Sequence, residues 1–162
     1  MRGMSQANLD LGIFQETKLT GGVYTRGSAG YSFVATDAPS RHRGGVAVFY
    51  RPSPQYAVKA IQKFGPNIFG FKLTMGERRW YIVGCYLSPE GTSTIESVIA
   101  ALKERPRGLG LVVTGDFNAN LENPEGDQSE DEIAVALTMV GLEDIPAHLL
   151  PRRRPWCQDG RT

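Results

Sequence analysis

Several features that would place the chain in a specialised class are scarce or absent. The 162 residues include only two cysteines, Cys85 and Cys157, which cannot form a disulfide framework and favour a reducing compartment. No apolar run approaches the roughly 18 residues that a membrane span needs, and the amino-terminal segment lacks the apolar stretch of a secretory signal. A net charge of +1 excludes a strongly basic coat, although a local basic patch stays possible. We therefore expect a soluble intracellular protein with no membrane partner.

The overall composition is that of a folded domain. Hydrophobic residues make up 41% of the chain and charged residues 22%, which is close to the average for globular proteins. Intrinsic disorder requires lower hydrophobicity together with a high net charge. A length of 162 residues is sufficient for one domain with its own core. We accordingly treat residues 1–162 as a single domain.

Short apolar runs separated by turn residues recur along the first half of the chain. They are rich in β-branched and aromatic residues, and many of the 19 glycines and 10 prolines lie between them. Such runs predict strands, and their close spacing is typical of antiparallel sheets. The predicted strands are 11–15, 31–35, 44–50, 56–61, 68–75 and 79–87. The Gly- and Thr-rich stretch 17–30 is predicted to be a loop.

Two helices and one further strand are predicted in the second half. A capping box at Ser93 precedes apolar residues at helical spacing, which predicts a helix over 94–104. A similar pattern predicts a helix over 131–140, after the acidic stretch 122–132. The unbroken apolar run 111–113 is typical of a strand buried on both faces. Meandering strands interrupted by helices predict an α+β sandwich of sheets with outer helices.

Polar residues follow the buried strand in the segment Gly-Asp-Phe-Asn. Asp116 and Asn118 are two positions apart, so on an extended chain both side chains would point to one side. A carboxylate can hold or activate a water, and an amide can donate to a phosphate oxygen. Gly115 would allow a close backbone approach. The alternative is that Asp116 and Asn118 only form an Asx-turn after the strand.

Two other strand ends carry chemistry-bearing residues. Glu16 follows the strand 11–15 and offers oxygen ligands of the kind that Mg²⁺ prefers, although a glutamate in this position is more often a solvated edge residue. Tyr86 lies at the end of the strand 79–87. Its hydroxyl could bind a phosphate, and the commoner alternative is a half-buried aromatic residue of the sheet.

The order of four short segments is more specific than any one of them. They are Leu-x-x-x-Gln-Glu-Thr at 11–17, Arg-Gly-Gly-Val-Ala at 43–47, Tyr-x-Ser-Pro at 86–89 and Gly-Asp-Phe-Asn at 115–118. With them the chain resembles, over about residues 9–162, the endonuclease/exonuclease/phosphatase superfamily. It looks most like the endonuclease domains of non-long-terminal-repeat (LINE-type) retrotransposons. The resemblance implies the DNase I-like fold, a four-layer α/β sandwich of two mainly antiparallel sheets with outer helices.

The resemblance also implies roles for individual residues. Glu16 matches the metal-binding glutamate of the family, with Gln15 supporting it. Asp116 and Asn118 match the pair that positions the attacking water and the scissile phosphate, and Tyr86 matches the tyrosine that contacts the phosphate or assists the leaving group. The implied chemistry is phosphodiester hydrolysis assisted by Mg²⁺ or Mn²⁺.

The chain departs from the family pattern at both ends. It has no strand ending in Asn ahead of 11–15 and no Ser-Asp-His segment, because neither His42 nor His148 follows Ser-Asp. We therefore expect a domain that lacks its first strand and its carboxyl-terminal strands. Such a fragment would have little nuclease activity, since the general-base pair is missing, and its sheet edges would be open to self-pairing.

Basic clusters are weaker candidates for phosphate contacts. His42 and Arg43, next to Arg41, would contact a DNA backbone, or they form a solvated loop. The pair 78–79 and the arginines 152–154 could also meet phosphates, although short basic clusters are usually exposed surface.

The function that the resemblance implies is a DNA endonuclease that nicks target DNA for a retroelement, upstream of a reverse transcriptase domain. In a eukaryotic host it would act in the nucleus. Two alternatives stay open. One keeps the fold with a lipid, inositol phosphate or RNA substrate, since fold does not determine substrate. The other is a catalytically inactive scaffold fragment.

Overall fold

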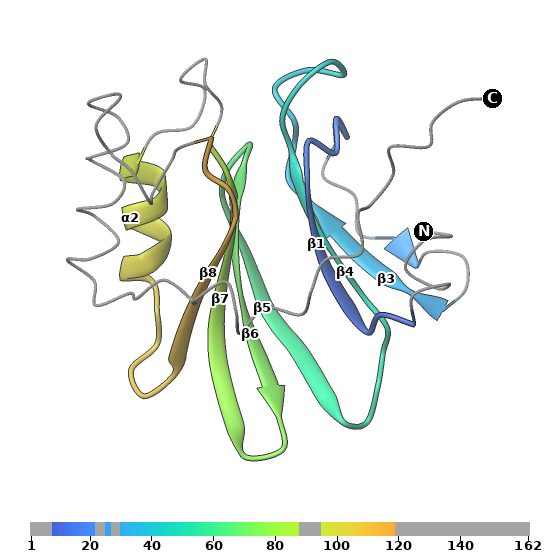
Figure 1. Ribbon diagram of the computed structural model, residues 1–162, viewed down its shortest axis with the longest axis vertical. Coiled ribbons are helices and arrows are strands. Elements are labelled where there is room, and N and C mark those ends of the chain that lie inside the picture. The colour runs from blue at the N-terminus through green and yellow to red at the C-terminus, as the bar shows by residue number, and fades with distance from the viewer. Residues whose placement is uncertain (1–7, 22–24, 27–29, 88–94, 119–162) are drawn as a thin grey trace.

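The structure is a computed structural model that describes residues 8–21, 25–26, 30–87 and 95–118. Within this part, two four-stranded sheets face each other, and one helix lies against the outside of the second sheet (Figure 1). Because both sheets present apolar side chains to the space between them, their facing surfaces form a common core. This layered arrangement confirms the predicted DNase I-like sandwich of two sheets.

The first sheet is antiparallel throughout and has the strand order β1-β4-β3-β2. Its strands are β1 (Leu11–Gln15), β2 (Thr25–Arg26), β3 (Ser32–Ala35) and β4 (Val46–Tyr50). The loop predicted for 17–30 was wrong at Thr25–Arg26, because these two residues pair with Phe33 and Ser32 of β3. Gln15 pairs with Val46, so the carboxyl end of β1 lies beside the start of β4.

The second sheet has the order β5-β6-β7-β8 and is mixed. Its strands are β5 (Tyr56–Gly65), β6 (Ile68–Met75), β7 (Arg78–Tyr86) and β8 (Gly110–Asp116). The first three pair antiparallel as predicted, whereas β8 runs parallel to β7. A parallel pair needs a crossover, and the connection that contains helix α2 (Ile95–Lys103) provides it. Figure 1 shows α2 on the side of this sheet that faces away from the first sheet.

Alternate residues of the second sheet enter two separate cores. Phe71 and Ile82 pack with Val48 between the sheets, and Val83 packs with Val98 and Leu102 under α2. A sheet covered on both sides explains why the sequence of β7 is apolar without alternation. Residues 111–113 of β8 also contribute to both cores, but they are half-buried rather than fully buried, because β8 lies at the edge of the described sheet.

Helix α2 begins and ends within one residue of the prediction. Val98 and Leu102 are buried on its inner face, while Lys103 lies in the last turn, where a cation is favourable to the helix dipole. The second predicted helix, 131–140, and the acidic stretch 122–132 lie outside the described residues. In the described part of the chain, no helix has the length and hydropathy needed to cross a membrane.

Candidate active site

Three strand ends bring the predicted catalytic residues to one end of the molecule. Glu16 follows β1 directly, Tyr86 ends β7, and Asp116 ends β8. Tyr86 and Asp116 are register partners in the parallel pair, so both side chains lie on one face, toward the first sheet. The hydroxyl of Tyr86 donates a hydrogen bond to Oε1 of Glu16. This bond joins the two sheets, and the pairing of β7 with β8 adds Asp116, so the site is built from three separate segments.

The hydrogen bond sets the protonation states of both partners. It lowers the pKa of Glu16 below the ordinary value of 4.5, and Lys18, whose Nζ lies 3.5 Å from Oε2, acts in the same direction. The same bond raises the pKa of Tyr86 above 10.0, together with burial and with the charges of Glu16 and Asp116. At neutral pH the pair is therefore a carboxylate and a neutral hydroxyl. The Glu16 side chain is 42% exposed, which leaves it accessible to a ligand.

Gly44 and Gly45 hold the segment that carries Glu16. The backbone nitrogen of Thr17 donates to Gly45 O at 3.1 Å, and that of Lys18 donates to Gly44 O at 2.9 Å. Both glycines have positive φ, and a Cβ on Gly45 would lie 2.6 Å from Oγ1 of Thr17. Glu16 itself has a φ of 53°. The Arg-Gly-Gly motif is thus a backbone cradle for the strand end, since only glycine fits these two positions.

Asn67 connects this cradle to Tyr86, and sequence reasoning missed it. It is fully buried; its Oδ1 accepts a hydrogen bond from the nitrogen of Gly45 at 2.7 Å, and its carbonyl accepts one from the nitrogen of Tyr86 at 2.9 Å. Thr36 reinforces the link, because its hydroxyl bonds the Pro66 carbonyl in the same turn. The sequence Gly-Pro-Asn is typical of an exposed turn. Only the tertiary fold buries Asn67, whereas Gly65 stays exposed and Pro66 is half-buried.

The Gly-Asp-Phe-Asn segment forms the Asx-turn that the sequence left as the alternative. The backbone nitrogen of Asn118 donates to Oδ1 of Asp116 at 3.0 Å, and Asn118 has a φ of 47°. The chain leaves the extended conformation after Asp116, but the two side chains still face one place as expected, because the charge of Asp116 and a hydrogen bond with the Asn118 side chain both act on the hydroxyl of Tyr86. Nδ2 of Asn118 also donates to Leu87 O at 2.7 Å. The turn nevertheless keeps Asp116 and Asn118 at the end of β8, beside the end of β7.

Gly115 allows the close approach of β8 to β7 that the sequence predicted. A Cβ at this position would lie 1.9 Å from the carbonyl oxygen of Cys85. Burial, together with the charge of Asp116, raises the pKa of the Cys85 thiol to about 12. The thiol therefore stays protonated and serves as a packing group of the α2 core. Cys157 lies outside the described residues.

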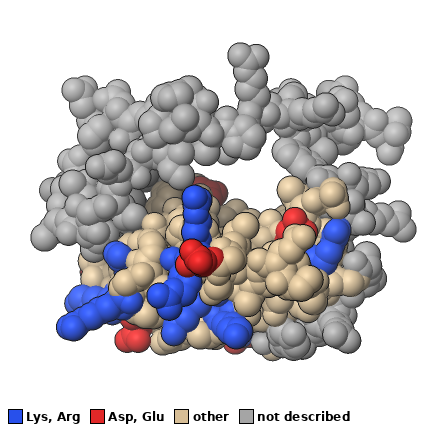
Figure 2. All heavy atoms as spheres, turned by 90° about the horizontal axis from the view of Figure 1, so that it is seen from below, with Lys and Arg blue, Asp and Glu red and all other residues tan. Residues whose placement is uncertain are grey.

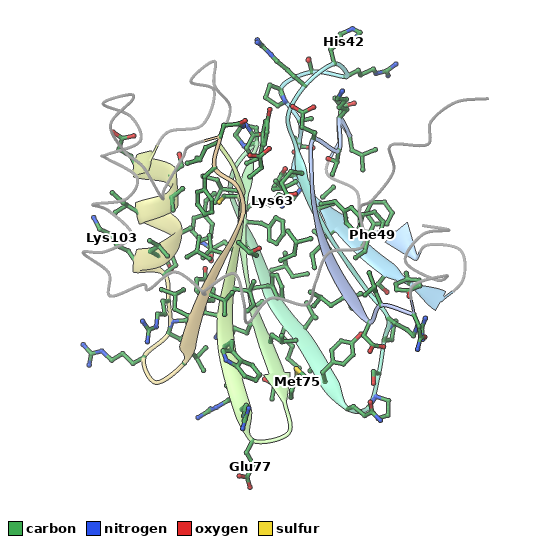
Figure 3. All side chains as sticks on the ribbon, viewed as in Figure 1. His42, Phe49, Lys63, Met75, Glu77 and Lys103 are labelled. Carbon is green, nitrogen blue, oxygen red and sulfur yellow. The ribbon has the colours of Figure 1, made fainter. Side chains whose placement is uncertain are left out.

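His42 and Arg43 lie at the same end of the molecule, on the connection between β3 and β4. His42 is exposed, and Figure 3 shows it at the tip of this connection. Its backbone nitrogen donates to Oγ of Ser40 at 3.2 Å, and the backbones of Arg43 and Ser40 form an isolated antiparallel β-bridge. Arg43 directly precedes the glycine cradle. The connection is thus a turn beside the site, and His148 and the arginines 152–154 lie outside the described residues.

Comparison with known proteins gives the family. The model of the Endonuclease/Exonuclease/phosphatase family matches residues 3–159. The chain belongs to this family. A solved structure with the same fold is the endonuclease domain of TRAS1, a telomere-specific non-LTR retrotransposon, with a TM-score of 0.62 and 18% sequence identity. The match covers 86% of this chain and 62% of that one, so the chain spans less than two thirds of the TRAS1 domain. No curated protein sequence matches the chain.

The donor atoms at the site are compatible with the divalent cation that this family generally uses. Glu16 and Asp116 supply carboxylate oxygens, and both charges act on the hydroxyl of Tyr86 between them. Oγ1 of Thr17 is a buried oxygen without a hydrogen-bond partner next to Glu16. Hard oxygen ligands of this kind suit Mg²⁺. Among the described residues, however, no cluster of three His, Cys, Asp or Glu side chains is found.

Proposed function

We propose that the chain is part of the nicking domain of a retroelement, a domain that hydrolyses DNA phosphodiester bonds with the help of a divalent cation. The observation that carries this proposal is the hydrogen bond from Tyr86 to Glu16, made beside Asp116. It brings the Glu16 carboxylate, a neutral hydroxyl donor and a second carboxylate to one end of two sheets. Membership of the Endonuclease/Exonuclease/phosphatase family and the similarity to the TRAS1 endonuclease domain support the nuclease assignment.

Each side chain has a distinct role in this proposal. The lowered pKa of Glu16 keeps it ionised, so it and Asp116 are the residues that would hold Mg²⁺ or Mn²⁺. The cation, when bound, neutralises phosphate charge and stabilises the leaving oxygen. Tyr86 has one hydroxyl proton, so it would contact a phosphate or leaving-group oxygen by exchanging its hydrogen bond to Glu16 for one to the substrate. Asp116 and Asn118 position the attacking water and the phosphate.

The wider context is part of the same proposal. The substrate is target DNA, and a reverse transcriptase domain follows in the full-length protein. Arg43 and His42, on the exposed turn beside the site, would contact the DNA backbone. In a eukaryotic host the protein would act in the nucleus.

Nicking of supercoiled plasmid in Mg²⁺ tests the proposal. The sequence contains no Ser-Asp-His segment, so the assay compares the 162-residue chain with a polypeptide extended at both ends. We expect stronger nicking by the extended polypeptide. Glu16→Gln and Asp116→Asn should each lower the nicking rate about 100-fold or more, as loss of a general-base or charge-stabilising group does. Removing Mg²⁺ with a chelator should abolish it.

Glu77→Gln is the matched control, since Glu77 is an exposed carboxylate at the opposite end of the molecule (Figure 3). It should nick at the wild-type rate. Retention of nicking in Glu16→Gln would contradict the assignment of the site. If neither the short nor the extended polypeptide nicks DNA, the DNA substrate is wrong, and lipid, inositol phosphate and RNA phosphodiesters become the substrates to assay.

A further inference from the structure

A second charged surface lies at the end of the molecule opposite the candidate active site. Strands β5, β6 and β7 contain five basic residues and no acidic residue. The five are Lys59, Lys63, Lys72, Arg78 and Arg79. Figure 2 views the molecule from this end, where Lys and Arg side chains gather. Lys63 lies nearer the candidate site than the others (Figure 3) and forms an ion pair with Asp37. The other four take no part in any ion pair among the described residues.

Three of these residues share the sheet face that carries α2. Lys59 and Lys72 are direct register partners on β5 and β6. Lys72 is opposite Tyr81, which packs in the α2 core, and Arg79 is two positions before Tyr81 on the same face. All three basic side chains are exposed. We call this group, Lys59, Lys72 and Arg79, the basic face.

Packing alone does not account for the basic face. Helix α2 covers the part of the sheet around Ile68 and Val83, and beyond that part the same face is exposed. Like charges directly opposite each other on neighbouring strands are destabilising. A lysine on an edge strand can prevent edge-to-edge pairing, which would explain Lys59 on β5. It does not explain Lys72, because β6 is an interior strand.

The chemistry of the basic face fits a phosphate backbone. The loop after α2 contains two exposed arginines, Arg105, whose Nε donates to Leu109 O, and Arg107. It also contains the acidic residue Glu104, whose charge acts on Tyr81 beside this face. No aromatic side chain among the described residues is exposed on this face to stack unpaired bases, since Tyr81 is buried and Trp80 packs between the sheets. Contacts from Lys and Arg to phosphates without base stacking are typical of sequence-independent binding to duplex DNA.

We propose that the basic face binds the backbone of a DNA duplex, separately from the catalytic end. The protein then holds a second segment of DNA in addition to the one that it cleaves. The inference depends on the proposed function in one respect, the choice of DNA as the polyanion.

The test measures the affinity of the 162-residue chain for a short fluorescent duplex by anisotropy across a salt series without Mg²⁺. The affinity of the double variant Lys59→Gln/Lys72→Gln for the duplex should be lower by about tenfold or more. The slope of log affinity against log salt concentration should fall in magnitude by about two, because each lost phosphate contact lowers it by about one. The single variant Lys72→Gln is compared with Lys103→Gln, which removes the same charge from an exposed position of α2 and should bind like the wild type. An unchanged salt slope in the double variant, or an equal loss in Lys103→Gln, overturns the proposal.

Two further measurements separate a binding role from a structural one. Lys72→Gln should melt at the wild-type temperature or above, because it relieves repulsion with Lys59, and a lower melting temperature would overturn the binding role. An unpaired strand of the same sequence should bind more weakly than the duplex, and tighter binding would overturn the assignment to duplex DNA. If the wild type and its extended form bind DNA through the basic face but nick no plasmid, the proposed function fails while this inference stands.

Discussion

At the scale of single residues, the pair of Glu16 and Tyr86 is the most informative contact in the molecule. It crosses between two sheets, and it shifts the pKa of the two groups in opposite directions. The sequence identified both residues but not their contact, because they are 70 positions apart. Their proximity depends on how the two sheets pack, which no local pattern encodes.

Removing the hydroxyl of Tyr86 should raise the pKa of Glu16. In Tyr86→Phe the largest cause of the lowered pKa is lost, so the pKa of Glu16 should rise toward 4.5. The acid limb of the nicking rate should move to higher pH with it. A titration followed by NMR at Glu16, beside the pH profile of nicking, measures both shifts. An unchanged Glu16 titration would contradict the assigned cause.

The same pair makes stability depend on pH at both extremes. The pKa of Glu16 is lowered by folding, so its contribution is complete above the ordinary value of 4.5 and is lost as pH falls through the lowered value. The pKa of Tyr86 is raised by folding, so its contribution is present below 10.0 and is lost as pH rises through the raised value. Urea denaturation across pH measures this, and the dependence should be weaker at both extremes in Tyr86→Phe.

Asn67 tests whether the turn between β5 and β6 positions the site. In Asn67→Ala the nitrogen of Gly45 loses its buried acceptor, which should cost about 1–3 kcal/mol of the free energy of unfolding. The nicking rate should fall as well, because the Gly44–Gly45 cradle holds Glu16. Gln62→Ala, at an exposed position of β5, is the control and should change neither quantity. Equal stability of the two variants would exclude the positioning role.

At the scale of elements, pattern and period predicted most of what the structure contains. The predicted strand 68–75 has the same bounds as β6, and the capping box placed α2 within one residue. The parallel pairing of β8 was not predicted, since an apolar run does not encode the direction of its neighbour. The two-residue strand β2 was missed for a related reason, because only its partner β3 makes it a strand.

The pairing of β7 and β8 requires a residue without a side chain at Gly115. In Gly115→Ala the new Cβ would lie 1.9 Å from a backbone oxygen that cannot move away. The substitution should cost about 3 kcal/mol or more and should displace Asp116 from its register with Tyr86. Gly108→Ala provides the comparison, because its φ of 76° is strained for alanine but the space is open. It should cost about 1 kcal/mol. Thermal unfolding of both variants checks that Gly115→Ala is the more destabilising of the two.

At the scale of the whole molecule, the first sheet is antiparallel and the second is mixed. Among the described residues, β1 is an edge strand of the first sheet and β8 of the second. Phe14 of β1 is 39% exposed and packs edge-on against Phe49, with ring centroids 5.1 Å apart. An apolar edge strand is a template for pairing with a second chain. We expect concentration-dependent self-association of the 162-residue chain, measured by sedimentation velocity. Phe14→Lys should reduce it, and a monodisperse wild-type monomer at high concentration would contradict the prediction.

The sequence by itself predicted the sandwich of sheets, most of the strands, the helix α2 and the candidate site residues. These follow from local periodicity, turn residues and four short motifs, each of which is a property of neighbouring positions. Only the tertiary structure decided which of these groups touch. It placed the hydroxyl of Tyr86 on Glu16, buried Asn67 as the link between the two sheets, and set Lys59 opposite Lys72. Such contacts depend on sheet register and on the packing of distant segments, which the chain specifies only through its complete fold.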